Sequence, residues 1–188
     1  MERFISKIRQ DMELADKIET FCDFRLDDEI LDCNSLDYGM TFNIAGLAFG
    51  NDGAGGEYIL LDDRTVGFCS SEGQCGRIAE NITDFFTLIT NCYYYCEYLH
   101  KELANDPDKL VEFFHRWEEK SREEFNEDYD DDFDTVRMEI GKALGIPVSE
   151  EAALQSLQRL YHCLTIEPQF ISYCQEDNGD LSPSEPLI

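Results

Sequence analysis

The stretch from Phe42 to Phe86 constrains the fold of this chain most strongly, because two glycine-rich turns in it flank a short hairpin pattern. Residues 58–61 and 66–69 are two runs rich in β-forming side chains, and the four turn-type residues 62–65 separate them. Two such runs around a short polar turn predict an antiparallel β-hairpin.

Three glycines lead into this hairpin: Gly53, Gly55 and Gly56. A P-loop would close on Gly-Lys-Ser/Thr, and no lysine lies near. A dinucleotide-binding fingerprint would need a third glycine where Tyr58 stands and a helix after it. We therefore predict that these glycines serve the turn, by a positive φ or by a close backbone approach that a Cβ atom would prevent.

The flanking segments predict further strands. Residues 40–49 read as one strand whose alternation slips at Ala45-Gly46, which is typical of a β-bulge. Residues 77–80 predict a short edge strand, and residues 170–174 a last strand, followed by a loose tail from residue 182. Together they give at least three antiparallel strands.

Apolar residues at helical spacing predict helices on both sides of these strands. Residues 2–19 read as one amphipathic helix. The acidic segment 20–39, with a turn at residues 36–39, is expected to pack around the sheet. A long helix capped by Asn81 is expected to run to Leu99, and later helices to follow Asp106-Pro107, to cover residues 129–144, and to follow the cap Ser149.

These elements predict an α+β fold: a small antiparallel or mixed sheet with packed helices and a C-terminal helical extension. The joints at residues 105–107 and 145–149 are too short to be linkers. We predict an α+β core at residues 1–105 and, packed on it as one compact unit, a helical extension with a last strand at residues 106–188.

The charge of the chain restricts its partners. Against 15 Lys and Arg stand 41 Asp and Glu, for a formal net charge of −26. Such a charge repels nucleic acid and anionic membranes and attracts basic proteins. General solubility is the alternative explanation. A hydrophobic content of 43% argues against general disorder.

The strongest charge feature is the run 118–134, in which ten acids stand against Lys120 and Arg122 for a net charge of −8. It lacks the central glycine and the terminal glutamate of a calcium loop. A solvated helix face and a docking surface for a basic partner are the two readings left open. Phe125, Tyr129 and Phe133 interleave with the acids at core-like spacing and are expected to face inward. The candidate partner-binding residues are Glu118, Glu119, Glu123, Glu124, Glu127, Asp128, Asp130, Asp131 and Asp132.

The eight cysteines form no Cys-x-x-Cys pairs. The sequence also shows no apolar leader and no apolar run of membrane-spanning length, so we expect reduced thiols in the cytoplasm. Cys92, Cys96 and His100 stand four residues apart and could hold zinc on one helix face. Phe85 and Ile89 share that face, which favours buried thiols, and we predict no metal and no cofactor. No nucleophile, base and oxyanion pattern is recognisable, so the chain is not expected to be an enzyme.

One resemblance adds to this reading. The order of Gly55, Gly56, Tyr58, then Asn81, Ile82 and Phe85 or Phe86 resembles the SUKH superfamily, which includes a yeast cell-wall-synthesis regulator and many bacterial immunity proteins. The resemblance covers about 45 residues, and the N-terminal Leu-Pro and Asn-Gly signals and a turn glycine at position 64 are missing.

The resemblance implies an immunity protein that blocks the active surface of a cognate toxin, and the net charge favours a basic toxin domain such as a nuclease. An intracellular scaffold or regulatory module is the alternative. The sequence leaves the oligomeric state open.

Overall fold

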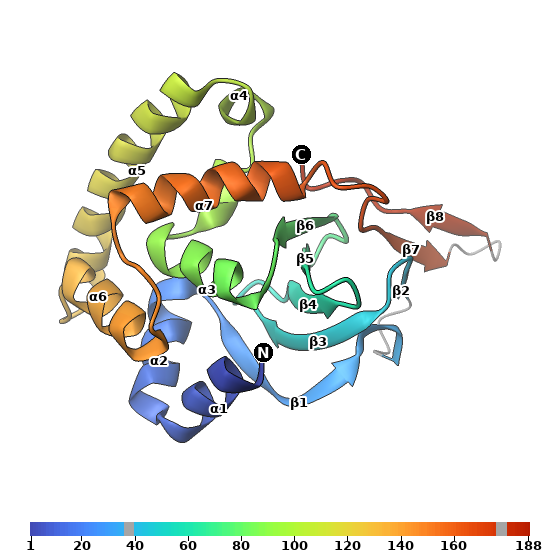
Figure 1. The fold of residues 1–188 in the computed structure, drawn as a ribbon, viewed down its shortest axis with the longest axis horizontal. Coiled ribbons are helices and arrows are strands. Elements are labelled where there is room, and N and C mark those ends of the chain that lie inside the picture. The colour runs from blue at the N-terminus through green and yellow to red at the C-terminus, as the bar shows by residue number, and fades with distance from the viewer. Residues whose placement is uncertain (36–39, 176–179) are drawn as a thin grey trace. The chain divides into compact units, whose positions relative to one another are not determined.

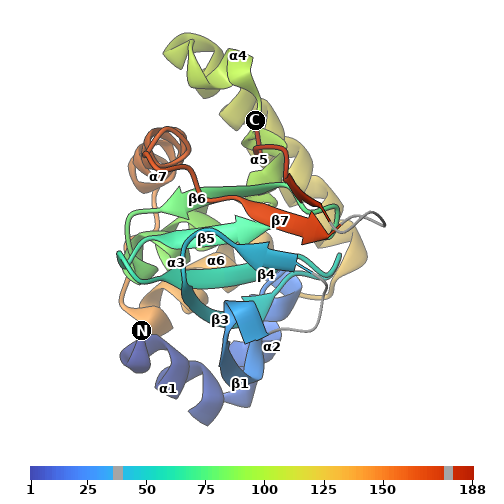
Figure 2. The same cartoon turned by 90° about the vertical axis from the view of Figure 1, so that its right-hand side faces the viewer.

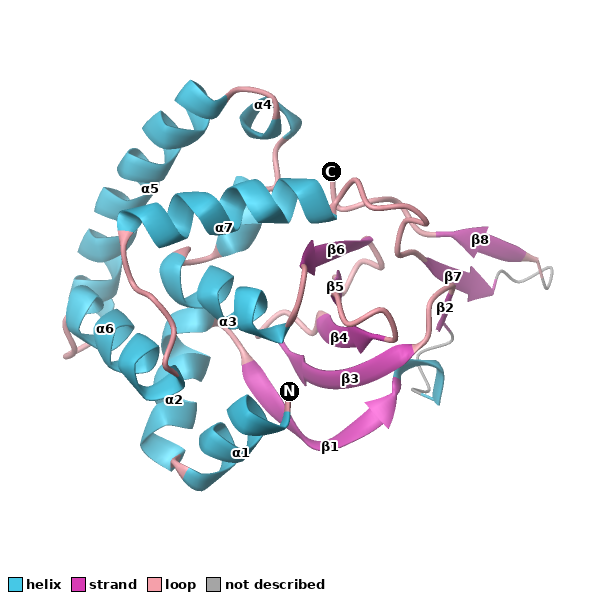
Figure 3. Ribbon diagram, in the orientation of Figure 1, coloured by secondary structure: helices cyan, strands magenta, loops and turns pink. Residues whose placement is uncertain are grey.

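The computed structural model describes residues 1–35, 40–175 and 180–188. Helices and antiparallel strands both occur in it, so the predicted α+β class is confirmed (Figures 1 and 3). The turn predicted at residues 36–39 lies outside the described residues. The chain forms two compact units, each made of two segments: Met1–Asp23 with Phe86–Gln158, and Phe24–Phe85 with Arg159–Ile188. The division of the sequence at residue 105 stays a prediction.

The first unit is helical. Its elements are α1 (Glu2–Gln10), α2 (Met12–Cys22), most of α3 (Ile82–Asn91), η2 (Tyr95–Tyr98), α4 (Lys101–Ala104), α5 (Pro107–Asp128), α6 (Phe133–Leu144) and the first part of α7 (Glu150–Cys163). Four aromatic rings form its centre: Phe133 lies 4.9 Å from Phe21, 5.5 Å from Tyr93 and 5.7 Å from Phe125, measured between ring centroids. Rings at these distances attract each other beyond the area that they bury.

Three predicted helices have different bounds: those over residues 2–19 and 81–99, and the one over residues 129–144, which begins at Phe133. The first helix is broken at Asp11, whose backbone is extended and whose carboxylate accepts a hydrogen bond from the Leu14 N–H at 3.1 Å, so that α2 begins with its own cap. The caps predicted at Asn81 and Ser149 are confirmed, because each side chain accepts from a backbone N–H in the first turn. The helix predicted to follow Asp106-Pro107 is also capped, by the Asp106 side chain. Gly145 ends α6 in the left-handed region, with φ 69°.

The long helix predicted from Asn81 to Leu99 is wrong beyond Asn91. There α3 ends, Tyr94 has φ 47°, and a short 3-10 helix follows. The cause is tertiary: Tyr93, Tyr95 and Tyr98 are all buried. Residues 93 and 95 would point to different sides of a continuous α-helix, because each residue turns it by about 100°.

The second unit contains two antiparallel sheets (Figure 2). The larger has the order β1-β3-β4-β5-β6, with β1 at Arg25–Asp32, β3 at Gly46–Asn51, β4 at Glu57–Leu61, β5 at Val66–Cys69 and β6 at Cys75–Ala79. The smaller has the order β2-β7-β8, with β2 at Met40–Phe42, β7 at Ser172–Gln175 and β8 at Leu181–Pro183; η1 (Cys33–Ser35) follows β1. The predicted hairpin is β4 and β5, paired Glu57 to Cys69 through Leu60 to Val66.

The strand predicted at residues 40–49 is two strands in different sheets. β2 pairs with β7, whereas β3 pairs with β1 and β4. Gly46 marks a close approach, because a Cβ there would lie 2.6 Å from the Leu60 carbonyl oxygen. The irregular pairing of β3 with β4 lies further on, between Ala48 and Gly50.

Two strands were not predicted. β1 carries four acids in eight residues and shows no alternation, but it is an edge strand, where charged side chains reach water and discourage pairing with other chains. β8 occupies the tail expected to be loose. It is also at an edge of its sheet, where Pro183 need not donate a ladder hydrogen bond.

Two of the three turn glycines have a visible role. Gly55 has φ 87°, and a Cβ on Gly56 would lie 2.6 Å from the Phe68 ring. The turn is closed by the Asp52 N–H donating to the Gly56 carbonyl at 3.0 Å. The Asp52 carboxylate accepts from the Gly56 N–H at 2.6 Å, so the loop satisfies its own backbone without a ligand.

Candidate functional site

Eight of the nine predicted partner-binding acids are exposed. They lie on the second half of α5 and on the short connection to α6, and we call them the acidic surface: Glu119, Glu123, Glu124, Glu127, Asp128, Asp130, Asp131 and Asp132. Asp132 also caps α6, accepting from the Thr135 hydroxyl at 2.7 Å and from the Thr135 N–H at 2.9 Å, and these two bonds lower the pKa of its carboxyl. Lys120 lies 3.5 Å from Glu124, an exposed pair that offsets little of the charge.

Glu118 is the exception. Its predicted assignment to the partner-binding surface is wrong, because its side chain is buried. The residue is 7% exposed, and its Oε2 accepts a hydrogen bond from Arg137 Nη1 at 2.7 Å. Arg122 lies 3.7 Å away on the same helix. Residue 118 lies on the inner side of α5, so its carboxylate forms ion pairs within the helical unit rather than with a partner.

Asp134 completes an ion-pair cluster of four side chains: Glu118, Arg122, Asp134 and Arg137. Asp134 accepts from Arg122 at 2.9 Å and from Arg137 at 2.7 Å, and the Arg122 bond lowers the pKa of Asp134. Both guanidinium groups lie over the Phe133 ring, at 5.4 and 5.1 Å from its centroid. The cluster therefore fixes α5 to α6 beneath the acidic surface.

The three aromatic residues of the acidic run also differ in exposure. Phe125 and Phe133 are buried as expected, but Tyr129 is 43% exposed. The reason is that α5 ends at Asp128 and Tyr129 has an extended backbone, so its side chain leaves the helical period. Its ring packs against that of Phe125, with centroids 4.7 Å apart.

Tyr129 lines a cavity of about 320 Å³ in the helical unit, which we call the Tyr129 groove. Its lining comes from α2 and from the end of α5 to α6: Glu13, Asp16, Lys17, Thr20, Phe125, Tyr129, Asp131 and Val136. The sequence did not point to Glu13 or Asp16, which are more than a hundred residues from the acidic run. They reach the groove only because α2 packs beside α6.

The single cation of the groove is already neutralised. Lys17 donates to Glu13 at 2.6 Å and to Glu139 at 2.8 Å, and these two bonds raise the pKa of its ammonium group. Asp16 and Asp131 have no such ion pair within the described part of the chain. The groove thus offers two carboxylates and an exposed aromatic face, a combination that suits a guanidinium or ammonium group.

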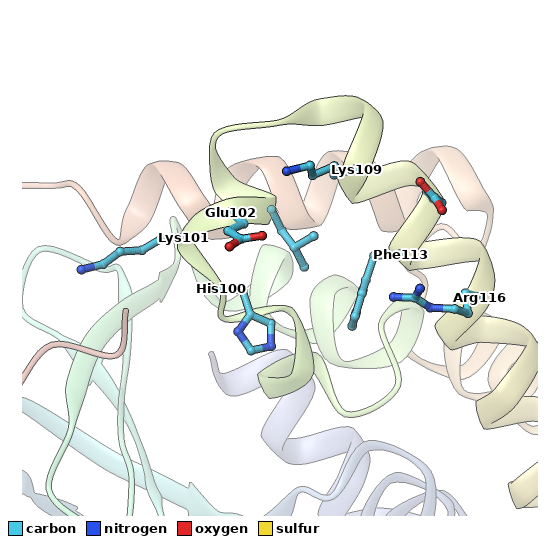
Figure 4. A pocket seen from close by; sticks show the side chains of 8 residues that line it. His100, Lys101, Glu102, Lys109, Phe113 and Arg116 are labelled. Carbon is cyan, nitrogen blue, oxygen red and sulfur yellow. The ribbon is translucent and has the colours of Figure 1, made fainter.

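A second cavity of the same unit has the opposite character (Figure 4). It measures about 500 Å³ and is lined by His100, Lys101, Glu102, Leu103, Lys109, Glu112, Phe113 and Arg116. Lys109, Phe113 and Arg116 extend from α5, while Lys101 points away from them. Lys109 and Arg116 lie here beside Glu102 and Glu112, so this cavity offers cations as well as carboxylates and suits a basic partner less well than the Tyr129 groove.

The structure does not bring Cys92, Cys96 and His100 to one helix face, because α3 ends before them. Cys92 is buried and Cys96 is exposed. Across residues 1–35, 40–175 and 180–188, no group of three or more His, Cys, Asp or Glu side chains is placed to hold a metal ion. His115 has a partner that its sequence neighbours did not suggest: its Nε2 lies 2.9 Å from an oxygen of Glu150, and both side chains are exposed.

Comparison of the chain with models of protein families, with curated proteins and with solved structures found no match. The resemblance to the SUKH superfamily therefore stays a prediction from the residues that carry it. Among the described residues, no helix is both long enough and apolar enough to span a bilayer.

Proposed function

We propose that this chain is a non-enzymatic binding protein that takes a basic protein partner on its acidic surface. The observation that carries the proposal is the Tyr129 groove beside eight exposed acids. The carboxylates would attract the partner over a Debye length, about 8 Å at physiological salt. The groove would then seat one arginine or lysine side chain against the Tyr129 ring, between Asp16 and Asp131.

The finer proposal is an immunity protein that covers the active surface of a basic toxin domain, such as a nuclease, inside the cytoplasm. Acidic side chains would then occupy positions that nucleic-acid phosphates take on the toxin. This step depends on the SUKH resemblance. The alternative is a scaffold or regulatory module, for which the same surface would hold a basic partner that is not a toxin.

The surface can be tested with defined probes before any partner is known. We would titrate the full chain with a nine-residue arginine peptide and with the same peptide made of citrulline, which keeps the shape and removes the charge. Binding of the arginine peptide alone, with an affinity that falls as salt rises, is the expected result.

The position of the site is tested by matched variants. The double variant Asp16→Asn with Asp131→Asn should weaken binding about tenfold, and Tyr129→Ala should weaken it about threefold, the loss expected for one exposed cation–π contact. The control is Glu29→Gln with Glu97→Gln, which removes the same charge from two exposed sites elsewhere. Equal losses in both double variants would mean that only net charge matters and that the groove is not the site.

The immunity-protein and scaffold proposals make different predictions about the protein encoded immediately upstream. If that protein is a toxin, the purified chain should form a stable complex with it and abolish its activity, and Asp16→Asn with Asp131→Asn should reduce the protection. A neighbour that is no toxin, or whose activity the chain leaves unchanged, would favour the scaffold.

A further inference from the structure

Two buried cysteines face each other in the larger sheet. Cys69 at the end of β5 is paired directly with Cys75 at the start of β6, next to the turn closed by the Ser70 N–H and the Gln74 carbonyl at 2.9 Å. Residues directly opposite in antiparallel strands have Cα atoms about 4.5 or 5.5 Å apart. A disulfide needs about 4.4–6.8 Å, so the backbone already has the right spacing for one.

The two thiols are not equivalent. They lie within hydrogen-bond reach of each other, and the bond from Cys69, helped by the hydroxyl groups of Ser172 and Ser184, lowers the pKa of Cys75 although burial opposes this. The same bond raises the pKa of Cys69. Of the two thiols, Cys75 is therefore the one that loses its proton more readily, although its Sγ also lies 3.4 Å from the Gly73 carbonyl oxygen, to which the protonated thiol donates. The thiolate is the reactive form of cysteine.

Access to Cys75 is narrow. A cavity of about 30 Å³ is lined by Cys75 and Cys163 and by the last residues of the chain, Pro186 to Ile188. The Glu185 carbonyl accepts from the Cys75 N–H at 3.2 Å, and Cys75 forms a parallel bridge with Pro186, so the tail runs beside β6 at this residue. A cavity of this size has room only for a small molecule. We therefore expect a small oxidant to reach Cys75 and a glutathione-sized disulfide to be excluded.

We propose that Cys69 and Cys75 form an oxidation site whose substrate is a small hydroperoxide. The Cys75 thiolate attacks one peroxide oxygen, the O–O bond breaks, and the second oxygen takes a proton and leaves as water or an alcohol. Cys75 is then a sulfenic acid. The Cys69 sulfur attacks it, the S–O bond breaks, and the hydroxide leaves as water with the Cys69 proton. Two electrons from the two sulfurs have reduced one peroxide.

The same cavity supplies an internal control. Cys163 lines it beside Cys75, but burial, with Glu80 and Asp84 nearby, raises the pKa of this thiol to about 12. Because both residues line one cavity but differ in ionisation, the oxidant should distinguish the two sulfurs. The exposed Cys96 provides a second comparison, for reaction governed by exposure; Cys174 is also exposed, but it lies near enough to Cys69 to raise the pKa of that thiol.

The experiment treats the full chain with one equivalent of hydrogen peroxide, alkylates the remaining thiols and maps the cysteines by mass spectrometry. We expect a Cys69–Cys75 cross-link that dithiothreitol reverses, with the Cys163 thiol intact. Oxidised glutathione should not produce the cross-link. Oxidation confined to Cys96 or Cys174, or equal oxidation of Cys163, would overturn the proposal.

Variants separate the two chemical roles. Cys69→Ser should leave Cys75 as a sulfenic acid that dimedone traps, and Cys75→Ser should leave Cys69 reduced. Cys163→Ser should change neither result. Ser172→Ala should raise the apparent pKa in the rate–pH profile, which in the unaltered chain should lie below the ordinary thiol value of about 8.5. A profile with the ordinary pKa in both proteins would contradict the assignment of Cys75 as the attacking sulfur.

Discussion

Glu118 and Arg137 are joined by a 2.7 Å hydrogen bond between Oε2 and Nη1, with about 10% and 15% of the two side chains exposed. This bond connects α5 to α6 directly below the acidic surface. It distinguishes one acid of the run from its neighbours: Glu118 stabilises the unit, while the eight exposed acids remain available to a partner.

Arg137→Ala should lower the free energy of unfolding by about 3 kcal/mol, because it leaves a buried carboxylate with Arg122 as a distant partner. Urea denaturation at pH 7 measures the change. Arg116→Ala is the control, since Arg116 is exposed and has its guanidinium over Phe113. If the two variants differ by less than about 1 kcal/mol, the cluster has no structural role.

Asp134 should make stability depend on pH. The hydrogen bond from Arg122 lowers the pKa of the folded carboxyl below its unfolded value of about 3.9. Its contribution is therefore present above that value and is lost as the pH falls through the folded pKa. Asp134→Asn should lower the free energy of unfolding at pH 7 by about 1 kcal/mol or less, because the side chain is 48% exposed and screened.

The check is urea denaturation of both proteins from pH 7 to pH 3. The difference between the unaltered chain and Asp134→Asn should shrink below about pH 4. A difference that stays constant over this range would mean that the lost stability comes from packing rather than from ionisation.

Gly46→Ala should destabilise the sheet by about 1–3 kcal/mol, as other overpacked sites do. The new Cβ would lie 2.6 Å from the Leu60 carbonyl oxygen, and backbone cannot move aside as a side chain can. The comparison is Gly55→Ala, whose Cβ meets nothing within 4 Å and whose φ of 87° costs about 1–2 kcal/mol. Thermal unfolding should therefore rank Gly46→Ala at or below Gly55→Ala in stability, and an unchanged melting temperature for Gly46→Ala would contradict the close approach.

Asp11→Ala should cost about 1 kcal/mol, because the side chain caps α2. Glu19→Ala, an exposed acid on the same helix, is the control and should change stability by less than about 0.5 kcal/mol. Urea denaturation compares the two. Equal effects would mean that α1 and α2 do not depend on the cap at Asp11.

Local signals predicted the elements that local chemistry specifies. The caps at Asn81 and Ser149 satisfy N–H groups three residues away, and the hairpin turn at residues 62–65 connects strands that are adjacent in the chain. The end of α3, by contrast, depends on where Tyr93 and Tyr98 find a core. β1 depends on the presence of a sheet edge, and neither condition is visible in a short window of sequence.

The candidate site likewise has features that the sequence predicted and features that only tertiary packing decided. The acidic run is a property of composition and sequence order, and its net charge follows from the residue types alone. The packing of α2, α5 and α6 decided three further features. It buried Glu118 apart from the other acids, left Tyr129 exposed and placed Asp16 in the lining of the Tyr129 groove. The pairing of Cys69 with Cys75 was likewise decided by strand register.

The sequence by itself thus determined the α+β class, the hairpin, the helix caps and the net charge, because each depends on residues close together or on a sum over the chain. Only the tertiary structure decided which charges are buried, which aromatic ring is exposed and which thiols meet. Those outcomes depend on contacts between segments far apart in the chain, where burial and desolvation determine the energy of each group.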